Sequence, residues 1–394
     1  MNQRETPVPA RRAERHSLAA RLPGEAPAVA GILTTLLVFA FQDTFFADLS
    51  NYPLTAFMFV WLFGVMLWGA FGVVRHADAV AEKLGEPYGT LVLTLSVIVI
   101  EVSLIAAIML HGQNNPTLAR DAMFATLMIV LNGMIGTALL MGALRYWEQE
   151  YNLEGARAFL VVIASLAVFA LIIPNYTKTV PDPSRSPFQA GLFAVITILF
   201  YVIFLIIQTV RHRAFFAEPA ANGNGNHHRA AAAYDSRRTH KHATGSLRYH
   251  VAMLLLTLIP IVLLSEFLAV LVDLGIEQLG LPPELGGILI AVLVLSPEGL
   301  TALHAALDNQ LQRAVNVCLG SALATIGLTI PAVLMIGLLA GSEVHLGLDQ
   351  LQAVLLILTL FVSALTFGGA RTNVLQGVVH LLLFVVYVAL IFSP

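Results

Sequence analysis

Residues 85–101 read GEPYGTLVLTLSVIVIE, and residues 281–298 read LPPELGGILIAVLVLSPE. In both stretches a glycine lies twelve residues before the final glutamate, Glu101 or Glu298, and the run between them is almost wholly apolar. A charged group inside an apolar helix is costly to place in a bilayer, and such residues usually mark a pathway or a binding site. The two stretches therefore predict a repeated unit with a functional acidic residue in each copy.

The chain as a whole is also unusually apolar. Of its 394 residues, 58% are hydrophobic and 11% are charged, whereas soluble domains carry about 25% charged residues. The apolar residues fall in about eleven blocks of roughly 20, the length that an α-helix needs to cross a bilayer. We therefore predict an all-α polytopic membrane protein with about eleven transmembrane helices, near 28–49, 53–74, 88–110, 118–143, 158–174, 188–210, 248–272, 284–307, 311–340, 350–369 and 372–393.

Hydrophilic stretches divide the chain into parts. Residues 1–27 carry five arginines and four prolines and lack the apolar core of a signal peptide, which predicts a disordered cytoplasmic tail without a cleavable leader, before a first helix in 28–52. Residues 212–247 contain Asn-Gly repeats and an alanine run, which is typical of a flexible linker. A metal-sensing element built on its histidines is the alternative. The linker separates the predicted halves 53–211 and 248–394.

Basic residues set the orientation, because cytoplasmic loops are enriched in Lys and Arg. With the N-terminus inside and eleven crossings, 18 of the 21 Lys and Arg lie in the cytoplasm, and only Arg120, Lys178 and Arg185 lie outside. This predicts a multi-pass protein of the cell (inner) membrane, with the N-terminus and the linker in the cytoplasm and the C-terminus outside. The two repeats then enter the membrane from opposite sides, the inverted arrangement that many secondary transporters use for alternating access.

Glu101 and Glu298 each lie near the middle of a predicted span. Because an α-helix rises about 1.5 Å per residue, this places both carboxylates near the centre of the bilayer. Two carboxylates suit a hard cation such as Ca²⁺, which takes about six to eight oxygen ligands. Burial disfavours the ionised form of a carboxyl group and two facing carboxylates repel each other, so protons compete with the metal for the same oxygens. We therefore expect a cation- and proton-binding site at these glutamates, without a cofactor. The alternative is a protonated pair that only ties helices together.

Hydroxyl groups near the glutamates are candidate auxiliary ligands, with ordinary interhelical hydrogen bonds as the alternative. Pro297 also removes a backbone donor and frees a carbonyl near Leu293. His76 and His304 are candidates for a proton path, because a histidine titrates near neutrality; solvated histidines at the membrane surface are the alternative. The auxiliary candidates from spacing alone are Thr94, Ser296, Thr301, Ser321 and Thr325.

The same residues resemble a known family. The chain is similar to the cation/proton exchanger branch of the calcium/cation antiporter superfamily in two motifs. The first is Gly85-Glu-Pro-Tyr-Gly-Thr-Leu running into Glu101-Val-Ser-Leu. The second is Pro283-Glu-Leu-Gly-Gly running into Leu295-Ser-Pro-Glu-Gly-Leu and Gly320-Ser-Ala-Leu-Ala-Thr. The match is best to bacterial calcium (sodium, potassium)/proton antiporters. The resemblance implies two inverted five-helix repeats plus an extra first helix, with Glu101 and Glu298 binding the cation and exchanging it for protons. It also implies a gate or proton-path role for Glu266, for which a glutamate that reaches water is the alternative.

Two departures from the family pattern bear on the site. Many exchangers carry Gly-Asn ahead of each glutamate, where this chain has Val97-Ile98 and Val294-Leu295. The asparagine amides that would serve as ligands at these positions are therefore missing. Sodium or potassium remains an alternative to calcium as the exchanged ion. The Gly-Ser element expected after the first glutamate lies either in 121–126, which would make Thr126 a ligand, or at Asn132-Gly133.

These observations predict a secondary antiporter that exports calcium in exchange for protons. A sodium or potassium/proton antiporter is the first alternative, and a passive channel or an integral-membrane enzyme using Glu298 or His304 are the others. Against an enzyme, the apolar blocks contain no nucleophile–base pair, histidine metal cluster or phosphate-binding glycine loop. The basic residues follow the cytoplasmic loops, so no nucleic-acid partner is expected. The expected partners are the lipid bilayer and the transported cations.

Overall fold

The structure, a computed structural model, describes residues 18–46, 49, 51–85, 88–111, 116–176, 187–219, 245–341 and 344–392. Its α-helices are α1 (Leu18–Phe45), α2 (Tyr52–Leu84), α3 (Tyr88–His111), α4 (Leu118–Met128), α5 (Ile135–Tyr146), α6 (Leu153–Ala167), α7 (Pro187–Ile206), α9 (Leu247–Leu279), α10 (Glu284–Leu307), α11 (Leu311–Ala324), α12 (Ile330–Ala340), α13 (Gln350–Thr366) and α14 (Val374–Phe392). Four π-helical segments, η1 (Ile129–Met134), η2 (Val168–Ile172), η4 (Ile207–Arg211) and η6 (Thr325–Thr329), and two 3₁₀ turns, η3 (Ile173–Tyr176) and η5 (Arg213–Phe216), continue or follow these helices. The fold class predicted from the sequence is confirmed.

The helices reproduce the predicted spans. Within the described residues, ten continuous helical stretches are long and apolar enough to cross a membrane, and α13 is a shorter apolar helix of 17 residues. The stretches α4–η1–α5 and α11–η6–α12 each form one span, because the helix continues through a π-helical segment. The two halves are therefore α2 to α7 and α9 to α14, each with five continuous helical stretches, of which α13 is the shorter one, and α1 is the extra first helix.

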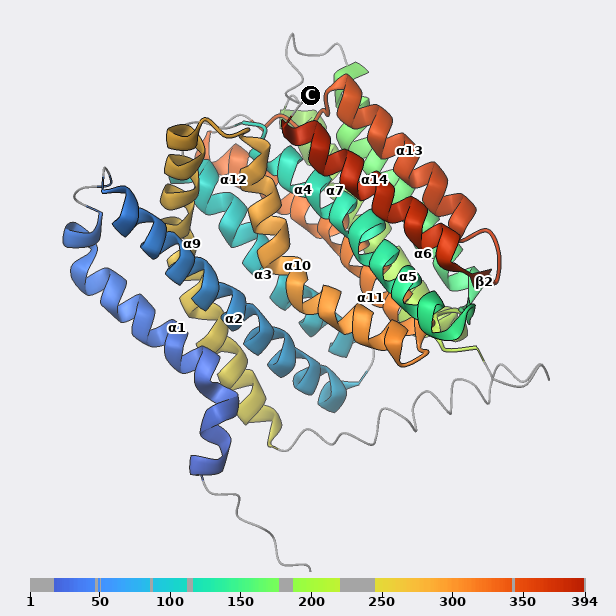
Figure 1. Cartoon of the computed structure of the whole chain (residues 1–394), viewed down its shortest axis with the longest axis horizontal. Coiled ribbons are helices and arrows are strands. Elements are labelled where there is room, and N and C mark those ends of the chain that lie inside the picture. The colour runs from blue at the N-terminus through green and yellow to red at the C-terminus, as the bar shows by residue number, and fades with distance from the viewer. Residues whose placement is uncertain are drawn as a thin grey trace, which may run out of the picture.

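The helices that carry the two glutamates lie in the middle of the molecule. Figure 1 shows α1 at one edge, outside α2 and α9, and α13 and α14 at the opposite edge. Between these edges α10 packs against α3, α4 and α11, while α2 packs against both α3 and α10. The central helices of one repeat thus contact those of the other.

Glycines allow these helices to approach each other closely. A Cβ atom on Gly287 of α10 would lie 2.6 Å from the backbone nitrogen of Ala122 in α4, and one on Gly89 of α3 would lie 2.6 Å from the carbonyl oxygen of Ala81 in α2. Neither backbone can give way as a flexible side chain would. Glycine at the start of each glutamate helix is therefore a packing requirement.

Contacts between turns group the helix ends at two sides of the molecule. Strand β1 (Gln149–Glu150), between α5 and α6, pairs antiparallel with β2 (Arg371–Thr372), between α13 and α14. On the same side the Tyr146 hydroxyl donates to the Leu307 carbonyl over 2.8 Å. On the other side the His345 N–H donates to the Pro116 carbonyl over 2.8 Å. Spans that cross the membrane in alternating directions would place the helix ends in the same two groups. Which of the two sides faces the cytoplasm stays a prediction.

The predicted tail ends earlier than expected. Helix α1 begins at Leu18, within the predicted disordered segment 1–27, and residues 1–17 lie outside the described part. Pro23 and Pro27 argue against a helix there, but Glu25 between them is held by side chains of α2 and α9. Tertiary contacts therefore stabilise a segment whose local sequence disfavours a helix.

Two further details were missed. The predicted linker 212–247 begins with an ordered turn, η5, whose Phe216 packs edge-on against Phe159 and Phe204. Residues 220–244, with His227, His228, His240 and His242, lie outside the described residues. The β1–β2 pair was also unforeseen, because two residues in each strand leave no alternating pattern in the sequence.

We expect Gly287→Ala to lower the stability of the protein by about 1–3 kcal/mol, the usual cost of forcing extra atoms into a packed interface. The measurement is the melting temperature of the detergent-solubilised protein. Gly64→Ala in α2 is the matched control, because a Cβ there meets no atom within 4 Å. Equal melting temperatures of the two variants would contradict the close packing of α10 on α4.

Candidate cation site

The site forms around two glutamates at the centres of α3 and α10. Glu101 is the fourteenth of 24 residues in α3, and Glu298 is the fifteenth of 24 in α10. The Glu101 side chain is 2% exposed, while Glu298 is partly buried. Their carboxylates are close enough to interact electrostatically, and the Glu298 carboxylate also interacts electrostatically with Asp78 of α2. The two predicted acidic residues therefore converge on one region.

Glu101 is held by the π-helical segment of the second repeat. The hydroxyls of Thr325 and Thr329 donate to the same oxygen, Oε2 of Glu101, over 3.0 and 2.9 Å. These threonines are the first and last residues of η6, and both are buried. A π-helical turn is wider than an α-helical one and is often found at functional sites. Here it presents two hydroxyls to one carboxylate.

Glu298 is held by the helix that leads into the same segment. The Ser321 hydroxyl in α11 donates to Oε2 of Glu298 in a short hydrogen bond. Ser321 precedes Thr325 by one helical turn, so the three hydroxyls lie along one face of α11–η6. Both glutamates, although they belong to different repeats, therefore take their hydrogen bonds from one stretch of chain.

The corresponding stretch of the first repeat does not copy this arrangement. Its π-helical segment, η1, contains Asn132-Gly133, while 121–126 lie in the preceding α4. Thr126 is buried in α4, but among the described residues it makes no hydrogen bond to either glutamate. Asn132 instead donates to Thr359 over 2.9 Å and lies 3.1 Å from Nδ1 of His380. The prediction of Thr126 as a ligand has no support in the contacts.

Three other auxiliary candidates bond elsewhere. The hydroxyls of Ser296 and Thr301 donate to carbonyls of their own helix, those of Val292 and Pro297, over 2.5 and 2.9 Å. The Thr94 side chain is hydrogen-bonded to Tyr201 of α7. Of the six predicted auxiliary ligands, the structure brings Ser321 and Thr325 to the glutamates.

The proposed gate and proton-path residues lie apart from one another. Glu266 in α9 and His304 in the last turn of α10 are exposed. His76 is 2% exposed and contacts Glu25, Arg75 and His250 at the ends of α1, α2 and α9. None of the hydrogen bonds described for His76 reaches Glu101 or Glu298.

Two residues near the glutamates escaped the sequence analysis. Thr329 follows Thr325 by four residues, and this helical spacing was a usable signal that both face the same partner. Asp78 lies in a part of α2 that was read as a loop, because the polar run around Arg75 ended the predicted span at residue 74. Its position inside a longer helix needs the tertiary structure.

The site offers oxygen ligands. Two carboxylates and three hydroxyls make a donor set that suits hard cations such as Na⁺, K⁺ or Ca²⁺, and also protons, but suits soft metals poorly. In the part of the chain that the structure describes, no group of three or more His, Cys, Asp or Glu is placed to hold a metal ion. Hydroxyls, backbone carbonyls or water must therefore complete any cation shell.

Sequence comparisons find related membrane transporters over most of the chain. A 40% identical protein of Sinorhizobium fredii, y4hA, aligns over 334 residues, 84% of this chain and 87% of its own. The sodium-potassium/proton antiporter ChaA of Escherichia coli is 38% identical over 331 residues, 83% of this chain and 87% of its own. A Ca²⁺/H⁺ antiporter of Aphanothece halophytica is 23% identical over 265 residues, 66% of this chain and 70% of its own.

Solved structures share the fold at low sequence identity. Native YfkE superposes with a TM-score of 0.69 at 18% identity, covering 94% of this chain and all of that one. The H⁺/Ca²⁺ exchanger CAX gives a TM-score of 0.66 at 15% identity, covering 94% and 89%. The sequence profile described as sodium/calcium exchanger protein matches residues 54–210 and 249–393, which take in both glutamate helices. The chain therefore belongs to the sodium/calcium exchanger family of secondary transporters.

Proposed function

We propose that this protein is a cation/proton antiporter in which the cation and protons occupy Glu101 and Glu298 in turn. The supporting observation is that two carboxylates on inverted repeats both receive hydroxyl hydrogen bonds from α11–η6. Inverted repeats around a midplane site are the usual basis of alternating access. Membership of a family of secondary transporters, which are not enzymes, excludes the membrane-enzyme alternative.

Charge balance supplies the coupling between cation and proton. Two ionised carboxylates inside a membrane protein are costly unless their charge is neutralised. One divalent cation, one monovalent cation with one proton, or two protons each neutralise the pair. If only neutral states of the site reorient, the cation crosses in one direction and protons return in the other. No further charged residue is needed for this exchange.

The exchanged ion has two candidates, each with an observation in its favour. Sodium or potassium is favoured by the 38% identical relative, which is named a sodium-potassium/proton antiporter. Calcium is favoured by the paired carboxylates, whose combined charge matches a divalent ion. Calcium/proton antiporters also occur among the more distant relatives.

We expect Glu101→Gln and Glu298→Gln each to reduce proton-coupled exchange at least about 100-fold, because a lost carboxylate removes both a ligand and a titrating group. Everted membrane vesicles that carry a pH gradient are given calcium, sodium or potassium, and proton release is followed with a pH-sensitive dye. The ion that releases protons at the lowest concentration is the substrate.

Glu277→Gln at the exposed end of α9 is the control and is expected to keep wild-type exchange. If either site variant exchanged every ion as fast as Glu277→Gln does, the two-glutamate mechanism would be wrong.

We expect Thr329→Val to raise the cation concentration for half-maximal exchange by about tenfold, since a hydrogen bond to a charged group is worth about 1.5–3 kcal/mol. Thr329→Ser, which keeps the hydroxyl, should restore most of the affinity. Thr301→Val is the matched control, because the Thr301 hydroxyl bonds only to its own helix at Pro297. A half-maximal concentration that is the same in Thr329→Val and Thr301→Val would remove Thr329 from the site.

We also propose that the N-terminus and the linker lie in the cytoplasm and the C-terminus outside the cell membrane, as the distribution of Lys and Arg predicts. Single cysteines at Ser184 and Ser236, introduced with Cys318→Ser, test this with a membrane-impermeant thiol reagent. In intact cells Ser184→Cys should react and Ser236→Cys should not, whereas everted vesicles should reverse the pattern. The opposite result would invert the topology.

A further inference from the structure

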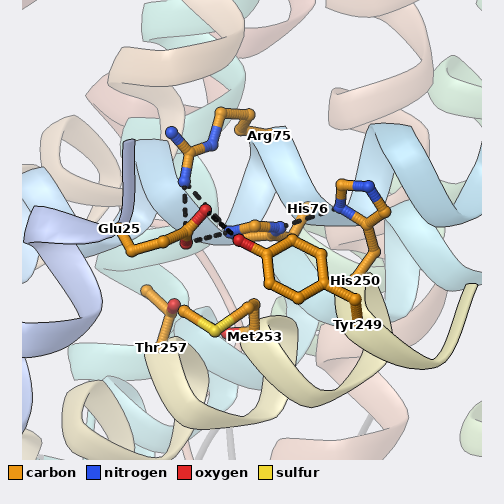
Figure 2. Close-up of polar contacts among 7 residues, drawn as sticks. All are labelled: Glu25, Arg75, His76, Tyr249, His250, Met253 and Thr257. Atoms are coloured by element: carbon orange, nitrogen blue, oxygen red, sulfur yellow. Dashed lines mark hydrogen bonds and ion pairs between the residues drawn. The ribbon is translucent and has the colours of Figure 1, made fainter. Parts of the chain in front are cut away.

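A second group of titratable side chains lies in the C-terminal half of α2 and at the first turns of α1 and α9 that pack against it. Figure 2 shows Glu25 of α1, Arg75 and His76 of α2, and Tyr249 and His250 of α9 pointing toward one another. We name these five residues the Glu25 cluster. Its contacts bridge the extra first helix, the first repeat and the second repeat, and the cation site uses none of its members.

Glu25 is the centre of the cluster. Its Oε1 accepts from the Tyr249 hydroxyl over 2.6 Å, and its Oε2 lies 2.9 Å from Nε2 of His76 and 3.2 Å from Nη2 of Arg75. The same Arg75 nitrogen lies 3.0 Å from Nε2 of His76. An ionised carboxylate accepts hydrogen bonds only, so Glu25 favours a proton on Nε2 of His76, whereas the Arg75 guanidinium, which only donates, favours the same nitrogen without a proton.

The two histidines meet through like nitrogens. Nδ1 of His76 lies 3.1 Å from Nδ1 of His250. A hydrogen bond at this distance requires one of these nitrogens to carry the proton and the other to accept it. If both Nδ1 atoms carried protons, as they must when both rings are cationic, two N–H groups would face each other and the contact would break.

This geometry limits the number of protons on the pair. The neutral pair has two protons on four ring nitrogens, and one more can be added without disturbing the Nδ1–Nδ1 hydrogen bond. The added proton can sit on Nε2 of His250, which is buried and has no hydrogen-bond partner among the described residues. Transfer of the shared proton between the Nδ1 atoms then moves the positive charge to His76, next to Glu25.

The charges around the pair limit it to at most one added proton. From α1, Glu25 attracts it, and from α2, Arg75 and Lys83 oppose it. From α9, Tyr249 contributes a neutral hydroxyl that donates to Glu25. With one attracting and two opposing groups, a second proton on the pair has no carboxylate to balance it.

The cluster is connected to the cation site through α2. His76 lies two residues before Asp78, and Asp78 is close enough to Glu298 to interact with it electrostatically. Helix α2 also packs against α3 and α10, which carry the two glutamates. His76 belongs to the first repeat and His250 to the second, so movement of one repeat against the other, the usual means of alternating access, must change their contact.

We propose that Glu25, His76 and His250 form a proton-binding site distinct from the transport glutamates, through which pH on the side of the N-terminal tail controls exchange. Uptake of one proton turns the Glu25–His76 hydrogen bond into an ion pair and tightens the packing of α1 on α2 and α9. Tighter packing resists the movement between repeats, so exchange falls as the pH falls through the titration of the pair. The control of exchange rests on the proposed antiport and orientation, whereas proton binding does not.

Two variants separate this regulation from simple packing. In everted vesicles, where the tail side faces the bath under the proposed orientation, exchange is measured at saturating cation from bath pH 5.5 to 8.5. The exchange rate of each variant is divided by the wild-type rate at the same pH, so that the change of the proton gradient with bath pH cancels. His250→Gln should exceed the wild type at low pH by at least about fivefold, a typical coupling between two sites, and should equal it at high pH. In Glu25→Gln the fall should move to lower pH, because the lost carboxylate stabilised the charged imidazole.

His345→Gln, which changes a histidine at the opposite end of the helices, is the control and should keep a constant ratio. Constant ratios for His250→Gln and Glu25→Gln as well would overturn the regulatory proposal. A lower rate at every pH without a change of profile would assign the cluster to structure alone and would equally overturn it.

Proton binding is measured independently by NMR of the full chain in nanodiscs with labelled histidine. The His76 and His250 signals should titrate together with a single midpoint and should lose this coupling in His250→Gln. Separate titrations, or no titration of the pair between pH 5.5 and 9, would overturn the site. If the wild type exchanges no cation, the proposed function fails, while this titration still decides whether the cluster binds a proton.

Discussion

The cost of a carboxylate inside a membrane protein is the constraint on which the rest of the structure depends. Glu101 and Glu298 lie at the middles of their helices, so neither can reach water at a helix end, and each needs polar partners within the protein. The partners come from α11–η6, where Ser321, Thr325 and Thr329 align along one face. This requirement brings α3, α10 and α11 together, and the glycines at the starts of α3 and α10 allow α2 and α4 to close around them.

The two repeats share their glutamates but differ in how they use their π-helical segments. In the second repeat η6 turns its hydroxyls toward Glu101, whereas in the first repeat η1 turns Asn132 toward Thr359 and His380 of α13 and α14. One segment therefore contacts Glu101, and the other connects the last two helices to the core through buried hydrogen bonds. The inverted symmetry of the helices does not extend to the side chains that complete the site, and for this reason the register of the first repeat was ambiguous in the sequence.

The sequence predicted what depends on local composition and spacing. Apolar blocks located the spans, and the equivalent glutamates identified two carboxylates that the structure brings close together, because both patterns are regular along the chain. It failed where long-range contacts decide: α1 starts earlier because Glu25 is anchored by α2 and α9, and α2 extends beyond residue 74 because His76 is buried there. Thr329 was recoverable from its four-residue spacing to Thr325. The lack of a hydrogen bond between Thr126 and the glutamates could not be predicted from the sequence, because it depends on how α4 is rotated against α10.

Under the proposed function, the hydroxyls of Ser321, Thr325 and Thr329 would let one site accept both a cation and protons, although this chain lacks the Gly-Asn that many exchangers carry ahead of each glutamate. A serine or threonine hydroxyl has one donor and two acceptor lone pairs, and it rotates freely. It can donate to a glutamate oxygen, as in the present structure, or turn its lone pairs toward a cation or toward a protonated carboxyl group. An amide must rotate as a whole to exchange its nitrogen for its oxygen. Three hydroxyls on α11–η6 therefore suit every state of the exchange cycle, while the choice among cations is left to the charge and spacing of Glu101 and Glu298.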